Sequence, residues 1–106
     1  MVKRGEVWLS QLDPTRGREI RKTRPCMIVS PPEIHDFLDV AIVAPMTTGS
    51  RPAGFRVPIK FAGKNGLVLL EQIRALDKSR LVRRLGSADS KTLMAALAIL
   101  CEMFGE

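Results

Sequence analysis

Groups suited to phosphate chemistry stand beside two apolar, strand-like runs of the sequence. Arg24 and Pro25 open one run, and Thr47 and Thr48 follow another. Proline restricts the residue before it to extended backbone, so Arg24 is anchored at the entry to its strand. Arginine stays charged at any working pH and contacts phosphate through two parallel hydrogen bonds. The two threonines fit either an ordinary turn or hydroxyls held at the end of a sheet, and the pattern alone favours the turn.

Such groups could bind a phosphodiester or cleave one without a metal. In RNA the 2′-OH can attack the neighbouring phosphate and expel the 5′ oxygen. A protein then has to align the attack, move two protons and neutralise the charge that builds on phosphorus. Arginine, threonine and glutamate suffice for this in principle. Glu71 and Gln72 follow four apolar residues, and the pattern leaves open whether they end a strand or point toward a ligand.

Positive charge is concentrated just before Pro25. The net charge is +6 and the isoelectric point is about 10.0. A second basic cluster spans residues 78–84. Clustered charge of this kind predicts a polyanionic partner, either a nucleic acid or an acidic protein. Within residues 15–24 Glu19 opposes five basic side chains, which are Arg16, Arg18, Arg21, Lys22 and Arg24.

Several enzyme classes are excluded by what the sequence lacks. His35 is the single histidine, and we expect it on the surface of a loop. A mechanism that uses two histidines is therefore impossible within one chain. The sequence has no Cys or His pair with metal-ligand spacing and no glycine-rich phosphate loop, so we expect neither a metal nor another cofactor.

The hydrophobic pattern predicts a mainly β fold. We expect strands at residues 6–12, 25–30, 39–45, 55–60 and 67–73, and a sixth short one at 79–85. Turn signals separate these runs, and the Asn-Gly pair of Gly63–Gly66 favours a tight reversal. Pro58 marks its strand as an edge or bulged strand. Short strands without intervening helices predict an antiparallel sheet that closes toward a small barrel.

The last segment predicts a helix over residues 90–104. Leu93, Leu97, Leu100 and Phe104 form one apolar stripe, capped by Ser87, Asp89 or Ser90 and ended by Gly105. So apolar a helix must cover the barrel, meet a second subunit, or do both. We expect a single domain over residues 1–106, without a signal peptide or membrane span, and a cytoplasmic location. Cys26 and Cys101 lie in apolar segments and are expected to be free, buried thiols.

Four blocks of the sequence together resemble the MazF/PemK-like toxins of bacterial toxin–antitoxin systems, which are sequence-specific endoribonucleases. The blocks are KRGEVWLSQLDPTRG, TRPCMIVS, VAIVAPMTT and VLLEQIRALDKSRL, in the order of that family. The resemblance implies a small SH3-like antiparallel β-barrel with a C-terminal α-helix, the CcdB/MazF-like toxin fold, assembled as a homodimer. It also implies metal-independent cleavage of single-stranded RNA, usually mRNA, to 2′,3′-cyclic phosphate and 5′-OH ends. The implied partner is an antitoxin with an acidic, partly disordered tail.

The resemblance also implies roles for individual residues. The essential arginine of the family falls on Arg24, its essential threonine on Thr47, and a glutamate near the substrate on Glu19, which we expect to be a base. Leu69 stands where some PemK-like members carry a second catalytic arginine, so we expect the MazF-like arrangement. Contacts to RNA are expected from Arg16, Gly17, Arg18, Arg21, Lys22, Thr48, Glu71 and Gln72.

Two other functions fit the same fold. A related branch of toxins binds DNA gyrase through its C-terminal helix, but the basic groove would then have no task. A non-catalytic nucleic-acid-binding barrel is the second alternative. Such barrels usually stack bases on exposed aromatic side chains, whereas aromatic residues make up 5% of this chain and tyrosine is absent. Cleavage of RNA in the presence of EDTA would distinguish these functions.

Overall fold

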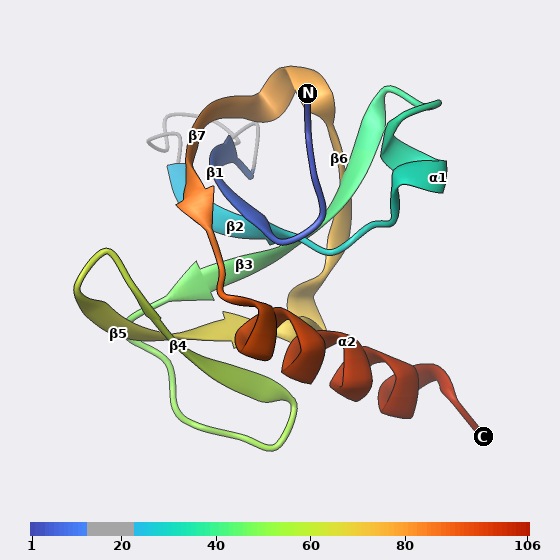
Figure 1. The fold of residues 1–106 in the computed structure, drawn as a ribbon. Coiled ribbons are helices and arrows are strands. Elements are labelled where there is room, and N and C mark those ends of the chain that lie inside the picture. Colours follow the sequence, from blue (N-terminus) through green and yellow to red (C-terminus); the bar gives the residue numbers. More distant parts are fainter. Residues whose placement is uncertain (13–22) are drawn as a thin grey trace, which may run out of the picture.

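The computed structural model describes residues 1–12 and 23–106. Its strands are β1 (Glu6–Gln11), β2 (Thr23–Ile28), β3 (Val40–Thr47), β4 (Arg56–Phe61), β5 (Lys64–Leu69), β6 (Arg74–Asp77) and β7 (Leu81–Ser87). The helices are α1 (Pro32–His35) and α2 (Ser90–Phe104), with single 3₁₀ turns η1 (Leu70–Gln72) and η2 (Lys78–Arg80). Figure 1 shows α2 lying against one side of a strongly curled sheet.

The sheet is antiparallel throughout and curls because β3 changes partners along its length. The strand order is β4-β5-β3-β2-β1-β7, and β6 also pairs with β3. The first part of β3 pairs with β6 and the last residues, Met46 and Thr47, pair with β5. The β4–β5 hairpin therefore turns away from β1, β2 and β7 (Figure 1). The predicted mainly β fold with a C-terminal helix is confirmed, and β4, which contains Pro58, is an edge strand as predicted.

Apolar side chains from β2 enter two separate cores. Met27 packs into the core beneath α2, together with Val7, Leu70 and Ala96. Cys26 and Ile28 point to the opposite face, toward Val43 and Leu76. Alternate residues of a strand face opposite sides of a sheet, so a strand buried on both faces must be apolar throughout. The uninterrupted run after Arg24 is explained in this way.

The predicted helix is confirmed at residues 90–104. Asp89 caps it, because its Oδ1 accepts a hydrogen bond from the Thr92 backbone N–H at 2.7 Å. Leu93 and Leu100 pack against the core as expected. Phe104 does not, since it is 72% exposed. The C-terminal end of α2 extends past the sheet in Figure 1, so the last part of the expected stripe has no strand to cover.

Three details of the strand prediction are wrong. The strand expected at 67–73 ends at Leu69, and Leu70–Gln72 form the turn η1. Strand β6 was not predicted, because its four residues are too short for a periodic pattern. The tight reversal lies at Ala62 and Gly63, whose φ angles are 51° and 78°, and Asn65 and Gly66 belong to β5. The register that pairs Val57 with Val68 buries both side chains, which outweighs the turn preference of Asn-Gly.

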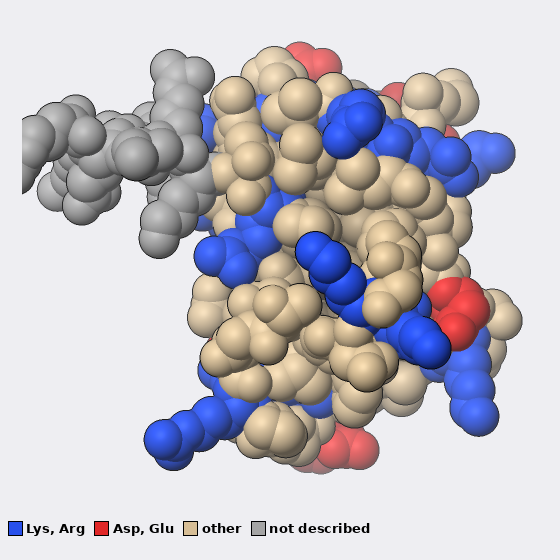
Figure 2. All heavy atoms as spheres, turned by 90° about the vertical axis from the view of Figure 1, so that its left-hand side faces the viewer, with Lys and Arg blue, Asp and Glu red and all other residues tan. Residues whose placement is uncertain are grey.

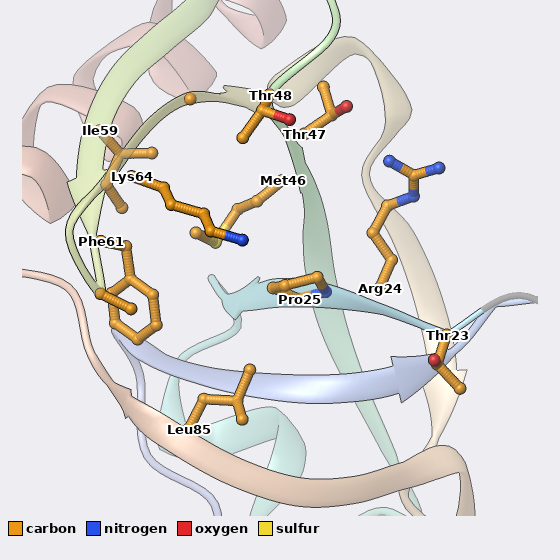
Figure 3. Close-up of a pocket in the computed structure, with 12 residues that line it drawn as sticks. Thr23, Arg24, Pro25, Met46, Thr47, Thr48, Ile59, Phe61, Lys64 and Leu85 are labelled. Atoms are coloured by element: carbon orange, nitrogen blue, oxygen red, sulfur yellow. The ribbon is translucent and has the colours of Figure 1, made fainter.

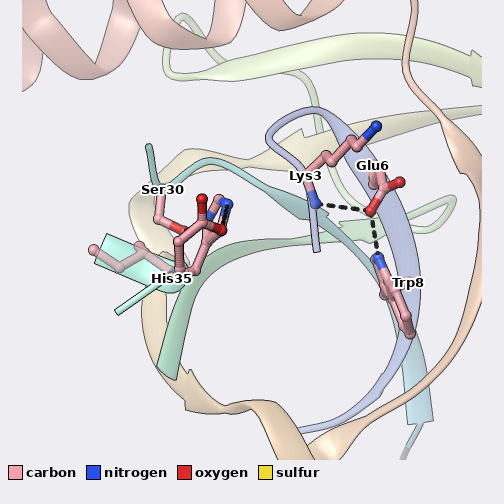
Figure 4. Close-up of polar contacts among 7 residues, drawn as sticks. Lys3, Glu6, Trp8, Ser30 and His35 are labelled. Carbon is pink, nitrogen blue, oxygen red and sulfur yellow. Dashed lines mark hydrogen bonds and ion pairs between the residues drawn. The ribbon is translucent and has the colours of Figure 1, made fainter. Parts of the chain in front are cut away.

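His35 is not the surface residue that the sequence suggested. It lies in α1, is 1% exposed, and its Nδ1 is 2.8 Å from Ser30 Oγ (Figure 4). Ser30 Oγ also accepts the backbone N–H of Ile42 at 3.1 Å, so the histidine fastens α1 to β3. Both cysteines are free, as expected, but only Cys26 is buried and Cys101 is exposed. Among the described residues, no helix is long and apolar enough to cross a membrane.

Candidate functional site

The sheet brings Arg24 and Thr47 together from the ends of β2 and β3. The two strands are paired with Cys26 opposite Pro45, Met27 opposite Ala44 and Ile28 opposite Val43. Continued by two residues, this register places Arg24 opposite Thr47. Tertiary pairing therefore joins two residues that are far apart in the sequence, and it does so through apolar strands that fix their positions.

Two hollows meet at this pair. The larger hollow has a volume of about 540 Å³ and the smaller hollow about 340 Å³. Arg24 and Thr47 line both, so they form a ridge between them, which we call the Arg24–Thr47 ridge. The larger hollow, shown in Figure 3, is also lined by Thr23, Pro25, Met46, Thr48, Ile59, Phe61, Ala62, Lys64, Gly66 and Leu85. The smaller hollow is also lined by Leu12, Pro45, Ser50, Leu69 and Gln72.

The cations at the hollows have no acidic partner in residues 1–12 and 23–106. Within the described residues, the carboxylates of Glu6 and Glu71 form ion pairs with other arginines, and neither Arg24 nor Lys64 has a carboxylate partner. Among the charged side chains on the face in Figure 2, Lys and Arg predominate, and the acidic side chains lie toward the edges. The site is therefore suited to a ligand that carries negative charge.

The Thr47 hydroxyl is oriented by the turn that follows β3. Its Oγ1 accepts the backbone N–H of Gly49 at 3.2 Å. Both alternatives for Thr47 are thus true, because the residue ends its strand in a turn and also lines both hollows. The hydroxyl can still donate its own proton to a ligand, since the Gly49 contact uses only an oxygen lone pair.

Gly66 allows β5 to approach the end of β3 closely. A Cβ atom at this position would lie 2.7 Å from the Thr47 backbone oxygen. The side chain of any other residue would therefore push Thr47 out of place or lengthen the pairing of β3 with β5. Sequence analysis assigned Gly66 to the wrong turn and so missed this role.

Glu71 and Gln72, which were expected to contact RNA together, have different surroundings in the structure. Both lie on η1 rather than on a strand, and of the two hollows Gln72 lines the smaller one, whereas Glu71 lines neither. Glu71 Oε2 instead accepts hydrogen bonds from Arg56, at 2.6 Å from Nη2 and 3.0 Å from Nε. These hydrogen bonds lower the pKa of Glu71. Arg56 also donates to the Arg51 carbonyl at 2.8 Å, so the ion pair secures the chain between β3 and β4.

Lys64 is a site residue that sequence analysis did not identify. In Figure 3 its side chain runs over the larger hollow, and the ammonium ends beside Met46 and points toward Pro25. The sequence pattern placed Lys64 in a turn, and only the hairpin register brings it here. The remaining expected residues, Glu19, Arg16, Gly17, Arg18, Arg21 and Lys22, lie outside the described part of the chain, so their roles stay predictions.

A metal site is not formed by the residues at the ridge. In residues 1–12 and 23–106, no three His, Cys, Asp or Glu side chains are grouped so that they could hold a metal ion. The groups that line the two hollows include the Arg24 guanidinium, the Thr47 and Thr48 hydroxyls and the Gln72 amide. These are hydrogen-bond donors suited to phosphate oxygens.

Comparison with known proteins gives consistent results. The family model described as "PemK-like, MazF-like toxin of type II toxin-antitoxin system" matches residues 3–104. The chain is 40% identical to Endoribonuclease PemK of Escherichia coli over 90 residues, which are 79% of this chain and 68% of that protein. It is 34% identical to Endoribonuclease MazF of Staphylococcus epidermidis over 91 residues, 80% of this chain and 76% of that protein.

Solved structures share the fold. The crystal structure of MazF from Deinococcus radiodurans has a TM-score of 0.82 with 24% identity, covering 99% of this chain and 97% of that one. A crystal structure of MazE-MazF from the same organism has a TM-score of 0.86 with 24% identity, covering 98% and 96%. The family model, which spans nearly all of the sequence, shows that this chain belongs to the PemK-like, MazF-like toxins of type II toxin–antitoxin systems.

Proposed function

We propose that the chain is a sequence-specific, metal-independent endoribonuclease that cleaves single-stranded RNA, including mRNA, and thereby inhibits translation. The observation that carries the proposal is the Arg24–Thr47 ridge, where an arginine without a carboxylate partner among the described residues faces a threonine hydroxyl. The names of the relatives, endoribonucleases PemK and MazF, support the same activity.

Each side chain of the ridge supplies one part of the chemistry. The scissile phosphate binds across the ridge, and the planar Arg24 guanidinium donates to its oxygens and neutralises the dianionic phosphorane. Thr47 donates its hydroxyl proton to the same phosphate, since the Gly49 N–H contacts an oxygen lone pair and leaves that proton free. Together they hold the 2′-OH, phosphorus and the 5′ oxygen in line. The 2′-OH proton passes to a base, for which Glu19 is the candidate, and the departing 5′ oxygen takes a proton from water as its bond to phosphorus breaks.

We also propose the partners that the family membership suggests. The predominantly basic face fits the acidic tail of an antitoxin, and structural relatives include MazE-MazF complexes. Helix α2 exposes Met94 near its start and Met103 and Phe104 at its end, apolar side chains suited to a second copy of the chain. The protein would then act as a homodimer in the cytoplasm.

The test is cleavage of a long unstructured RNA in the presence of EDTA. We expect discrete fragments with 2′,3′-cyclic phosphate ends from the unmodified chain and none from Arg24→Ala. Arg83→Ala is a matched control, because Arg83 is an exposed arginine of β7 that lines neither hollow. If no variant cleaves while all bind RNA in a salt-sensitive way, the chain is a binding module and the proposal is wrong.

A further inference from the structure

The larger hollow opens directly beside the position proposed for the scissile phosphate. Arg24, Thr47 and Thr48 stand at one end of it, and Lys64 reaches over it from the β4–β5 hairpin (Figure 3). A phosphate held by the ridge would therefore have a neighbouring nucleotide at the mouth of this hollow. The established family membership does not say what the hollow receives.

The lining of the larger hollow combines an apolar surface with a single ammonium group. Pro25, Met46, Ile59, Phe61 and Leu85 supply flat or flexible apolar side chains. A volume of about 540 Å³ lies within the range of small-molecule sites. A nucleobase matches these properties, because it has two apolar faces and a polar edge. A phosphate alone would leave the apolar lining unused.

We propose that the larger hollow is a nucleobase subsite next to the scissile phosphate, and that Lys64 determines its specificity by favouring guanine or uracil over adenine. This inference rests on the proposed function, because the hollow is defined relative to the phosphate on the ridge. Lys64 is a contact to the base and takes no part in bond cleavage.

The preference follows from the hydrogen-bonding capacity of the ammonium. An ammonium only donates hydrogen bonds. Guanine presents the acceptors O6 and N7 side by side and uracil presents carbonyl oxygens, whereas adenine sets its N7 acceptor beside an exocyclic amine that donates and repels the ammonium. A well-placed pair of this kind discriminates against the wrong base by about tenfold or more. Within the described residues, the ammonium has no carboxylate partner that would compete with the base.

The hairpin holds Lys64 in place. Lys64 pairs with Phe61 across the two-residue turn Ala62–Gly63, and both turn residues have positive φ angles. Such turns match the twist of a hairpin and fix its register. The neighbouring Lys60 pairs with Asn65 in the same hairpin but does not line the larger hollow. Lys60 thus provides a matched control, because it carries the same charge and belongs to the same hairpin as Lys64.

The test measures base preference with RNA that cannot be cleaved. A single-stranded pool carrying 2′-O-methyl groups is randomised, bound to the protein, and sequenced in the bound and free fractions. We expect the unmodified chain to select guanine or uracil at one position, with adenine disfavoured by about tenfold. In Lys64→Met, which keeps the aliphatic stem but removes the charge, this preference should disappear, whereas Lys60→Met should retain it.

The same variants are then tested for cleavage of unmodified RNA. Lys64→Met should still cleave, with adenine newly accepted at one position adjacent to the cut. An unchanged base preference in Lys64→Met would overturn the inference. If the variant changes only the oligomeric mass, a second copy of the chain fills the hollow, and the inference is again wrong. Failure of the proposed function is distinguishable, because it appears as absent cleavage by the unmodified chain, whatever the binding experiment shows.

Discussion

Two charged residues at opposite ends of the β1–β2 pair, Glu6 and Arg24, differ in whether the fold supplies them with partners. At the start of β1, Glu6 is nearly buried and saturated with donors. Its Oε1 accepts the Lys3 backbone N–H at 2.9 Å and Trp8 Nε1 at 3.1 Å, as Figure 4 shows, and its Oε2 accepts Arg84 Nε at 2.8 Å. At the Arg24–Thr47 ridge, the guanidinium of Arg24 has no carboxylate partner within the described residues.

The difference separates charges that serve folding from charges that serve a ligand. A buried carboxylate is costly unless hydrogen bonds replace its water, so each donor around Glu6 contributes to stability. A half-exposed arginine stays hydrated and needs no partner to fold. Substitutions in the two regions should therefore affect different measurements, and the following experiments test how strictly this separation holds.

The largest effect is expected for Arg24→Lys. Lysine keeps the charge but loses the planar fork that contacts two phosphate oxygens. We expect the cleavage rate at saturating RNA to fall by about 100-fold, comparable to the loss of one transition-state donor elsewhere. The urea midpoint should stay unchanged, because Arg24 has no carboxylate partner among the described residues to lose. A lower midpoint would mean that Arg24 also stabilises the fold. The proposed separation between charges for folding and charges for a ligand would then be wrong.

The converse is expected for Glu6→Gln. The amide keeps one acceptor but loses the charge-assisted hydrogen bond from Arg84, and its NH₂ group faces donors. We expect the free energy of unfolding to fall by about 2 kcal/mol, with the cleavage rate per folded molecule unchanged. Urea unfolding and an RNA assay on the same samples measure both quantities.

The pH dependence of this effect has a defined sign. Burial by itself would raise the pKa of Glu6, but the hydrogen bonds from Trp8, Lys3 and Arg84 outweigh it and lower the pKa. The ionised carboxylate therefore stabilises the fold above the usual carboxyl pKa, and this stability is lost as pH falls through the lowered value. The difference between the unmodified chain and Glu6→Gln should shrink in acid. A difference that grows in acid would contradict this assignment.

Features of the structure that depend on neighbouring residues can be predicted from the sequence, whereas features that depend on long-range pairing cannot. Helix α2 was predicted correctly because its period, its Asp89 cap and its lack of proline all lie within one segment. Arg24 and Thr47 could be named as candidates from the sequence because each stands beside an apolar run. Their register is set by long-range pairing of β2 with β3, which no local pattern encodes.

The errors in prediction arise where tertiary contacts outweigh local preference. The burial of His35 depends on a hydrogen bond to Ser30, and the place of Lys64 depends on the hairpin register. The partners of Glu6 come from three segments, including Arg84, which is 78 residues away in sequence. The ion pair of Glu6 with Arg84 therefore could not be predicted from the sequence.

A smaller effect is expected for Gly66→Ala, which tests whether the ridge depends on its backbone. The new Cβ would approach the Thr47 backbone oxygen to 2.7 Å, so the end of β3 must shift. We expect a loss of about 1–3 kcal/mol in stability, as for other overpacked sites, together with a lower cleavage rate and an unchanged affinity for RNA. Gly54→Ala is the control, since nothing lies within 4 Å of its Cβ position. If both variants behave alike, the close approach of β5 does not position Thr47.

The smallest effect is expected for labelling of the cysteines, which tests whether solvent reaches the sheet beneath the Arg24–Thr47 ridge. Cys26 lies two residues beyond Arg24, is fully buried, and its thiol contacts the Arg24 carbonyl at 3.6 Å. Burial raises the pKa of Cys26 to about 11, so almost no thiolate forms at neutral pH. Cys101 is exposed on α2. A thiol reagent at neutral pH should therefore modify one cysteine per chain in the native protein and two in denaturant. Peptide mapping should place the native label on Cys101. Rapid labelling of Cys26 would show that the sheet opens at the ridge, and the rigid placement of Arg24, on which the proposed mechanism depends, would then be lost.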